Sequence, residues 1–257
     1  MLSALKRLVF VLLLAATASA HASSGKYQDW WWDPAKSGMG FNIGHQENTL
    51  FVMWFLYGDD GKATFLQLAG NLSGDQLSGT LYRTAGPAPG PSFNPANVSA
   101  TAVGSASITF SASNAALFTY SFEGKSGTIS LQRYTFANVD LSGVRPYAAT
   151  GTLSSCQSSS NNGSYDTGGY LSATKSGSSY SFTQQSLDGM TCNYTVPLSQ
   201  KGSILGGSGN FSCSGGLAGT IEISDLRKVD DFINMEYTMR YSTGESCVDR
   251  GKLAAAD

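Results

Sequence analysis

The chain has 257 residues, of which 13% are charged, and its formal net charge is −2. A nucleic-acid partner needs a basic stripe that neutralises several phosphates. No run of Lys or Arg occurs here, so neither nucleic-acid binding nor membrane-surface binding through basic residues is expected. Abundant Gly, Ser, Thr and Asn, beside an apolar fraction of 41%, favour short strands and tight turns over helices.

Residues 1–22 have the pattern of a signal peptide. Lys6 and Arg7 precede an apolar run from Leu8 to Ala16, and small residues suited to cleavage follow. The run is shorter than the roughly 20 residues that span a bilayer, and no later stretch reaches that length, so no transmembrane segment is predicted. We therefore expect a secreted or periplasmic protein. Without Lys6 and Arg7 its charge is −4, because 14 basic residues then face 18 acidic ones.

Three of the four tryptophans follow as Trp30, Trp31 and Trp32. Successive side chains of a strand point to opposite faces, so the three rings cannot all enter one core. Large planar rings stack on sugar rings or on other aromatic rings. Two interpretations therefore stay open: a platform for a glycan or an apolar small ligand, or a plug that seals a barrel end or the contact with a second module.

From Met39 onward, apolar runs alternate with glycine-containing turns at a spacing that suits antiparallel strands. Simple sequential order favours a barrel or a curled meander, because closure removes exposed edges. The prolines of the segment 84–97 mark it as a loop, since proline lacks the donor that a central strand needs. We predict strands in this first module, residues 26–145, near 39–46, 49–57, 63–70, 76–83, 97–103, 105–112, 115–122 and 127–136.

The predicted strand 49–57 is apolar on both faces, with Trp54 on one face and Phe55 and Tyr57 on the other. A strand that faces water on one side should alternate polar and apolar residues. We therefore expect its outer face to be covered by the tryptophan segment, by the second module or by a partner. Trp54 and Tyr57 accordingly join the three consecutive tryptophans as candidate ligand-binding residues.

His45 is the one histidine certain to remain after signal cleavage, because His21 lies at the cleavage zone. We expect it to be partly buried and hydrogen-bonded to Gln46 or to a backbone carbonyl, and we keep it as a further candidate in the ligand site. One histidine cannot form a multi-histidine zinc site, and oxidised cysteines are unavailable as ligands. No metal, cofactor or catalytic residue is predicted.

The second module, residues 146–257, contains all four cysteines. An even count after a signal peptide indicates two disulfides, with three connectivities open. We favour Cys192–Cys213, which would close a hairpin-sized loop, and Cys156–Cys247, which would tie the first strand to the last. A helical turn is considered at 224–233. Strands are predicted near 148–155, 168–174, 178–184, 190–196, 208–213, 217–224, 234–241 and 246–254.

The opening Trp31-Trp32-Asp33-Pro34-Ala35-Lys36-Ser37-Gly38-Met39-Gly40 resembles a recurrent module of secreted bacterial proteins with the pattern Trp-Trp-x-Pro-x-x-Ser-Gly-x-Gly. The aromatic strand around Trp54 and the stretch Gly127 to Tyr134 extend the resemblance over roughly residues 28–136. It departs from the pattern at Phe65, where a tryptophan is common. The resemblance implies export and β-architecture, and no established activity.

Taken together, the patterns predict an all-β protein of two antiparallel meander or barrel-like modules, the second stapled by disulfides. The leading functional hypothesis is a non-enzymatic protein that binds a glycan or another cell-envelope component through its aromatic cluster. The alternative is a structural or protein-interaction role. A weak hydrolase ranks below both, because it would need two carboxylates, from among Asp29, Asp33 and Glu47, across a sugar-binding cleft.

Overall fold

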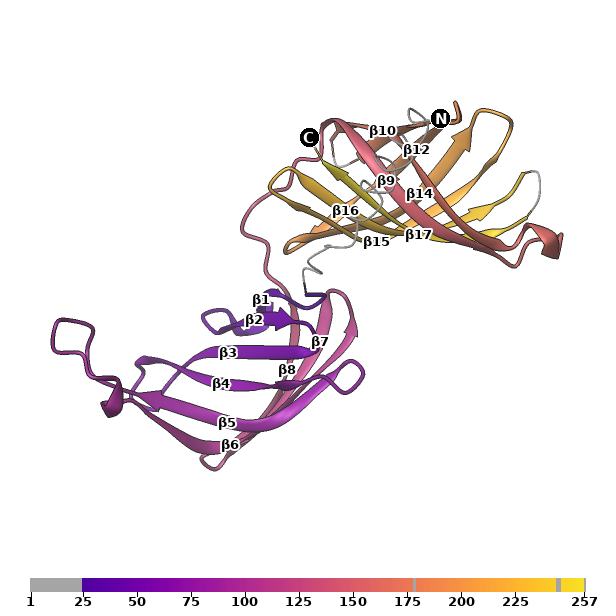
Figure 1. Ribbon diagram of the computed structural model, residues 1–257. Helices are drawn as coiled ribbons and strands as arrows, with labels where there is room; N and C mark the ends of the chain where they lie inside the picture. Colours follow the sequence, from indigo (N-terminus) through magenta and orange to yellow (C-terminus); the bar gives the residue numbers. More distant parts are fainter. Residues whose placement is uncertain (1–24, 178, 244–245, 257) are drawn as a thin grey trace, which may run out of the picture.

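The structure is a computed structural model that describes residues 25–177, 179–243 and 246–256, and the predicted signal peptide lies outside these residues. The chain forms two antiparallel barrels, one after the other in sequence (Figure 1). This confirms the predicted all-β fold of two modules. The described residues include no helix long and apolar enough to cross a membrane.

The first barrel is an up-and-down barrel of eight strands in sequential order, and β1 pairs with β8 to close it. Hairpin pairing brings each strand beside the next. The strands are β1 (Asp29–Trp32), β2 (Gly40–Gln46), β3 (Thr49–Tyr57), β4 (Ala63–Asn71), β5 (Gln76–Ala85), β6 (Ser99–Ala112), β7 (Ala115–Phe122) and β8 (Lys125–Arg133).

Two details of this barrel differ from the sequence prediction. The stretches 97–103 and 105–112 form one long strand, β6, because Gly104 is not a turn residue. A Cβ at Gly104 would overlap Ser121 O of the neighbouring strand, so this glycine allows close approach of two backbones. The eighth strand is instead β1, which contains the tryptophans and pairs with both β2 and β8.

Side chains fill the interior of the first barrel. Trp54 stacks on Phe41, with ring centroids 5.7 Å apart, and meets Phe118 edge-on at 5.2 Å. Such aromatic pairs contribute beyond the area that they bury. An eight-stranded barrel is just wide enough for its side chains to fill it. This interior therefore packs as a core around Trp31, Phe41, Ile43, Leu50, Val52, Trp54, Leu66, Leu68, Leu77, Leu81, Ile108, Phe118, Ile129 and Leu131.

The proline-containing segment between β5 and β6 is a connector, as predicted. It contains one short 3-10 helix, η2 (Pro95–Asn97), capped by the Asn94 side chain. In Figure 1 it projects from the barrel as an arm. Phe93 and Val98 on this arm are exposed at 47% and 48%.

The second barrel follows the same up-and-down order, and β12 pairs with β14 to close it, while the short β13 lies beside β14. Its strands are β9 (Gly143–Ser154), β10 (Gly163–Ser176), β11 (Ser179–Ser186), β12 (Thr191–Pro197), β13 (Ser199–Lys201), β14 (Ile204–Cys213), β15 (Ala218–Val229), β16 (Phe232–Tyr241) and β17 (Val248–Ala256).

Both predicted disulfides are present, Cys156–Cys247 and Cys192–Cys213. Cys192 and Cys213 are register partners on β12 and β14, so this bond lies across the seam that closes the barrel. Cys156 and Cys247 are 91 residues apart in sequence and join the loop after β9 to the segment before β17. Closing so long a loop restricts the unfolded chain more than closing a short one.

The helical turn considered at 224–233 is wrong, because β15 extends through Val229 and β16 begins at Phe232. Of the charges that suggested a helix, Asp225 and Arg227 follow the two-residue period of a strand. Asp225 and Arg227 lie two residues apart and form an ion pair of 2.8 Å. Side chains at i and i+2 share one face of a strand, whereas in a helix they diverge.

Candidate functional site

The six candidate residues divide between the inside and the outside of the first barrel. Trp31, Trp54 and His45 are buried, at 1%, 3% and 8% exposure. Trp30 and Tyr57 face outward, at 42% and 53% exposure, and Trp32 is half-buried. The structure therefore does not gather the six into one site. Only the outward group can touch a ligand without opening the barrel.

His45 takes the structural role expected of it. Its Nδ1 accepts a hydrogen bond from Tyr27 N at 3.2 Å, and its Nε2 lies 2.9 Å from Glu47 O. With Nδ1 as acceptor, Nε2 carries the proton and donates to the carbonyl. Burial lowers the pKa of His45 from its ordinary value, which favours this neutral form.

Trp31 is held in the barrel core by polar contacts as well as packing. Its indole N–H donates to Tyr27 O at 3.0 Å, and the guanidinium of Arg133 lies 4.7 Å from its ring centroid. It also meets Phe110 edge-on at 5.5 Å. Trp31 is thus a core residue of the first barrel, tied to the segment before β1 and to β8.

The outward faces of β1 and β3 form an aromatic surface. The rings of Trp30 and Phe55 are nearly parallel, at 23°, with centroids 5.8 Å apart. Phe51 and Tyr57, on the same face of β3, are 46% and 53% exposed. The described part of the chain thus leaves much of this face open to solvent. Of the covers expected for the outer face of β3, the tryptophan segment supplies the ring of Trp30, which packs against Phe55.

A second exposed aromatic group lies where the first barrel ends. Trp32 meets Tyr134 edge-on, with centroids 5.1 Å apart, and Tyr134 stacks on Phe136 at 6.4 Å. Tyr134 and Phe136 are 42% and 70% exposed. These rings adjoin the aromatic surface through β1, because Trp30 and Trp32 point to the same side of that strand.

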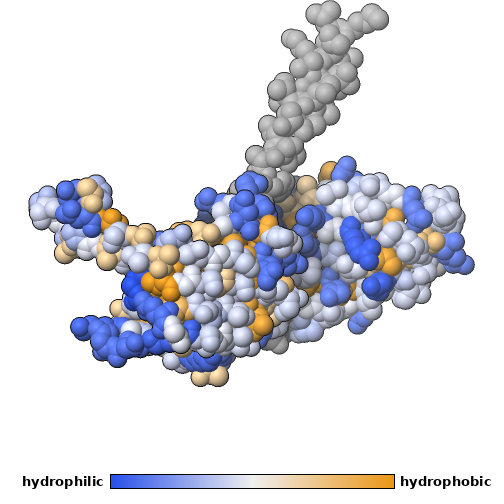
Figure 2. Space-filling model, turned by 90° about the horizontal axis from the view of Figure 1, so that it is seen from below, coloured by the Kyte–Doolittle hydropathy of each residue, from blue (hydrophilic) through white to orange (hydrophobic). Residues whose placement is uncertain are grey.

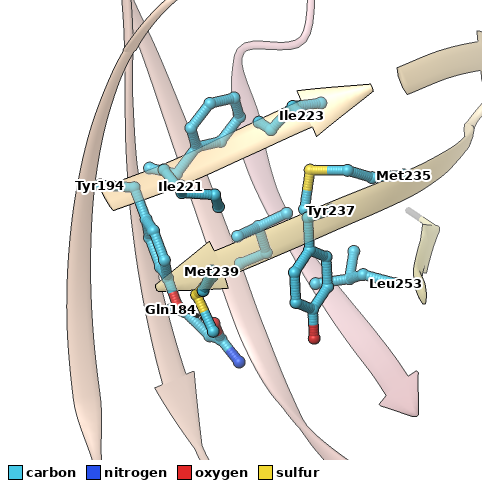
Figure 3. A pocket seen from close by; sticks show the side chains of 10 residues that line it. Gln184, Tyr194, Ile221, Ile223, Met235, Tyr237, Met239 and Leu253 are labelled. Atoms are coloured by element: carbon cyan, nitrogen blue, oxygen red, sulfur yellow. Dashed lines mark hydrogen bonds between the residues drawn. The ribbon is translucent and has the colours of Figure 1, made fainter. Parts of the chain in front are cut away.

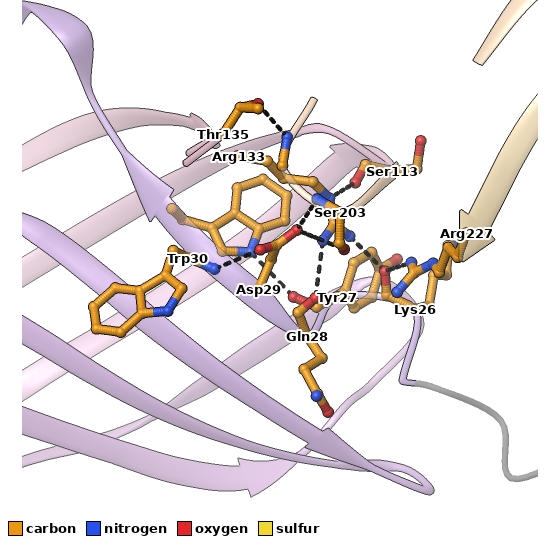
Figure 4. Close-up of polar contacts among 12 residues, drawn as sticks. Lys26, Tyr27, Gln28, Asp29, Trp30, Ser113, Arg133, Thr135, Ser203 and Arg227 are labelled. Carbon is orange, nitrogen blue, oxygen red and sulfur yellow. Dashed lines mark hydrogen bonds and ion pairs between the residues drawn. The ribbon is translucent and has the colours of Figure 1, made fainter. Parts of the chain in front are cut away.

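Two buried arginines, one from each barrel, converge on the segment before β1 (Figure 4). Arg133 donates from Nη2 to Lys26 O at 2.6 Å, and Arg227 donates from Nη2 to the same oxygen at 2.8 Å. Arg133 also donates to Gln28 O at 2.9 Å and to Ser113 O at 2.7 Å. We call this set of contacts the arginine latch.

Asp29 extends the arginine latch to the second barrel. Its Oδ2 accepts from Arg133 Nη1 at 2.9 Å and from Ser203 N and Oγ at 2.9 and 2.8 Å (Figure 4). Its side chain is 6% exposed, and that of Arg133 is fully buried. A buried charge pair needs such additional hydrogen bonds to offset the cost of desolvation. The latch therefore fixes the turn between β13 and β14 against β1.

Gly202 makes this contact possible, and its substitution gives a sharp test. Gly202 and Gly74 have the same backbone conformation, with φ of +61° and +62°. A Cβ at Gly202 would overlap the Asp29 carboxylate and lie 2.8 Å from Arg133 Cβ, whereas a Cβ at Gly74 has nothing within 4 Å.

We expect Gly74→Ala to lower the free energy of unfolding by about 1–2 kcal/mol, the cost of a left-handed residue with a side chain. Gly202→Ala should lose about 1–3 kcal/mol more, because overpacking adds to that cost. Urea denaturation of both variants measures the difference. Equal losses would mean that the turn moves away from Asp29 freely.

A cleft of ≈ 850 Å³ lies beside the latch, lined by Lys26 and Ser113 of the first barrel and by β9, β10 and β15–β17 of the second. Most of its charged side chains pair with one another. Asp225 pairs with Arg227 at 2.8 Å, and Glu236 with Lys252 at 2.8 Å. The cleft thus presents mixed, compensated charge and no group of one sign that would select an ion.

The second barrel encloses a cavity of ≈ 20 Å³, about the space of one water molecule. Figure 3 shows the Tyr194 and Tyr237 hydroxyls and the Gln184 amide at one end of it, and Ile221 and Ile223 at the other. Tyr194 donates to Gln184 Oε1 at 2.6 Å, and Gln184 Nε2 donates to Tyr147 OH at 2.6 Å. The interior of this barrel is therefore also filled.

A buried carboxylate continues this polar end. Tyr165 donates to Asp249 Oδ2 at 2.7 Å and shares a hydrogen bond of 2.9 Å with Tyr237 OH. Asp249 is 1% exposed, and its Oδ1 has no hydrogen-bond partner among the described residues. Burial raises the pKa of Asp249 and of Tyr165, and it raises the pKa of Tyr237 to about 12.

The sequence prediction missed this cluster, although a signal was present. Gly151 and Gly251 are register partners on β9 and β17. A Cβ at either position would overlap the ring of Tyr165 or of Tyr237. Glycine inside a strand indicates that another group approaches closely, and here that group is a tyrosine ring.

No protein-family model matches the chain, and no curated protein or solved structure is significantly similar to it. The case for a function therefore depends on the sequence and on the geometry of the two barrels.

Proposed function

We propose that the protein is a non-enzymatic binding protein for a glycan or another cell-envelope component, and that its site is the exposed aromatic surface of the first barrel. The supporting observation is the parallel pair of Trp30 and Phe55, flanked by Phe51 and Tyr57, on an outer face that solvent reaches. Exposed contiguous aromatic surface on a protein marks an interaction site. Both interiors are filled, so a large ligand would bind outside them, and the aromatic surface offers exposed rings that the cleft beside the latch lacks.

Export of the protein to the periplasm or the exterior is part of this proposal. The two disulfides fit an oxidising compartment. The signal-peptide pattern of residues 1–22 and the resemblance of residues 28–136 to a secreted bacterial module point the same way. A cell-envelope glycan is a ligand that a protein in that compartment meets.

The nearby carboxylates support binding rather than hydrolysis. Asp29 is buried in the arginine latch. Asp33 accepts a hydrogen bond from Ala35 N at 2.9 Å and caps the 3-10 helix η1 (Pro34–Lys36). Glycoside hydrolysis uses two carboxyl groups that flank the scissile bond. Two of the three carboxylates near the tryptophans thus have structural partners.

Trp30→Ala should weaken binding of a glycan ligand at least about tenfold, because truncating a central aromatic contact removes a large part of binding energy. Leu117→Ala is the matched control, since Leu117 is 46% exposed on β7, outside the aromatic surface of β1 and β3, and it should bind as wild type does. Calorimetric titration against an oligosaccharide panel measures both, because it does not depend on the tryptophan that one variant removes.

Unchanged affinity in Trp30→Ala, with a ligand that wild type binds, would exclude the aromatic surface as the site. No binding of any oligosaccharide would favour the alternative of a protein-interaction role. The arm between β5 and β6 supports that alternative, because it exposes Phe93 and Val98 away from the barrel.

A further inference from the structure

The strands of the first barrel carry no charge on their outer wall. Outward positions on β1–β8 alternate with the buried core residues, and none of them is Asp, Glu, Lys or Arg. The charged residues of this module lie at strand ends, in turns or inside the barrel, as Asp59, Lys125 and Arg133 do. In Figure 2 white, the colour of intermediate hydropathy, dominates the visible face of this barrel, with orange patches among it.

One row of this wall has an aromatic ring at each end and two amides between them, on either side of a methionine. The pairing register places Trp30 beside Asn42, Asn42 beside Met53, Met53 beside Gln67 and Gln67 beside Tyr82. Strands lie about 4.8 Å apart, so the row runs about 19 Å across β1–β5. Trp30 and Tyr82 at its ends are 42% and 39% exposed.

The two amides of the row are free to bind a ligand. Within the described residues, neither Asn42 nor Gln67 makes a side-chain hydrogen bond, and both are partly exposed. A primary amide offers two donors and one carbonyl acceptor. Sugar hydroxyls are both donors and acceptors, and the apolar faces of sugar rings pack against aromatic rings.

We propose that the first barrel binds a neutral, linear polysaccharide, laid across β1–β5 along the row from Trp30 to Tyr82. This inference rests on the function proposed above and specifies its ligand class and direction. A polyuronate, a phosphorylated glycan or a lipid headgroup would need Arg or Lys beside its anionic groups, and the wall has none. Trp30 and Tyr82 stack on sugar rings, while Asn42 and Gln67 bind hydroxyls between them.

The test compares cellohexaose and chitohexaose, as neutral probes, with hexagalacturonate as an anionic probe of equal length. We expect the protein to bind at least one neutral probe, with an affinity independent of salt, and not to bind hexagalacturonate. Asn42→Ala and Gln67→Ala should each weaken binding roughly three- to tenfold, the effect of one lost hydrogen bond. Ser107→Ala and Thr119→Ala, on the opposite wall, are the controls.

The outcomes separate this inference from the proposed function. If Trp30→Ala weakens binding but both amide variants bind as wild type does, the row is wrong and glycan binding stands. If hexagalacturonate binds as tightly as the neutral probes, or if salt weakens binding, the neutral ligand class is wrong. If neither neutral probe binds, this inference fails, while the proposed function is decided separately by the oligosaccharide panel and Trp30→Ala. Thermal unfolding of each variant shows whether that variant folds. The salt dependence of probe binding is measured on the wild-type protein, so it does not depend on the folding of any variant.

Discussion

Arg133→Met should lower the free energy of unfolding by roughly 3–5 kcal/mol, the usual cost of removing one partner of a buried ion pair. The methionine keeps an apolar stem of similar length but takes the guanidinium away from Asp29 and from three backbone carbonyls. The Asp29 carboxylate then stays buried with its Ser203 donors but no positive partner. Burial lowers the pKa of Arg133, and the ion pair with Asp29 opposes that shift. The guanidinium stays charged, so the latch is a full charge pair.

Arg83→Met is the control for this prediction. Arg83 and Glu123 form an ion pair of the same kind, at 2.8 Å, but their side chains are 34% and 43% exposed. An exposed pair contributes less than about 1 kcal/mol. Urea denaturation should therefore separate the two variants clearly. Similar losses in both would mean that the arginine latch contributes no more than a surface pair.

The fold was predictable because its signals are local. Alternating apolar residues and glycine turns gave most strands of the first barrel within a few residues of their observed ends, and cysteine spacing gave both disulfides. The errors arose where a local pattern has two meanings. Gly104 suggested a turn but allows close backbone approach inside β6. Asp225 and Arg227 suggested a helix but pair across one strand face.

The candidate site was predictable only in part, because a run of aromatic residues does not reveal which of them a closed barrel buries. Alternation correctly implied that Trp30, Trp31 and Trp32 could not share one face. Alternation could not show that Trp54 points into the barrel, because β3 is apolar on both faces. The row that includes Asn42 and Gln67 depends on strand register, which links residues far apart in sequence. Such pairing is not visible in any single segment.

The tyrosines of the second barrel predict that stability falls steeply above pH 10. Burial raises the pKa of Tyr237 from 10.0 to about 12, and it raises that of Tyr194 further. The unfolded chain therefore releases both protons near pH 10, while the folded chain retains them. Because the folded state then binds more protons, the free energy of unfolding decreases as the pH rises. The same direction holds for Tyr165 and Tyr241.

Between pH 10 and about 12, Tyr194 and Tyr237 should each lower the free energy of unfolding by roughly 1.4 kcal/mol per pH unit. Above that window Tyr237 ionises in the folded state as well, and its contribution levels off.

Urea denaturation at a series of pH values measures the slope. The double variant Tyr194→Phe, Tyr237→Phe should reduce the slope by about half, because phenylalanine has no proton to release while Tyr165 and Tyr241 still contribute. Tyr170→Phe, which removes a hydroxyl from a residue 55% exposed on the same barrel, should keep the full slope. A wild-type slope equal to that of the double variant would mean that Tyr194 and Tyr237 ionise equally in the folded and unfolded states, and that the polar end of the second barrel admits water.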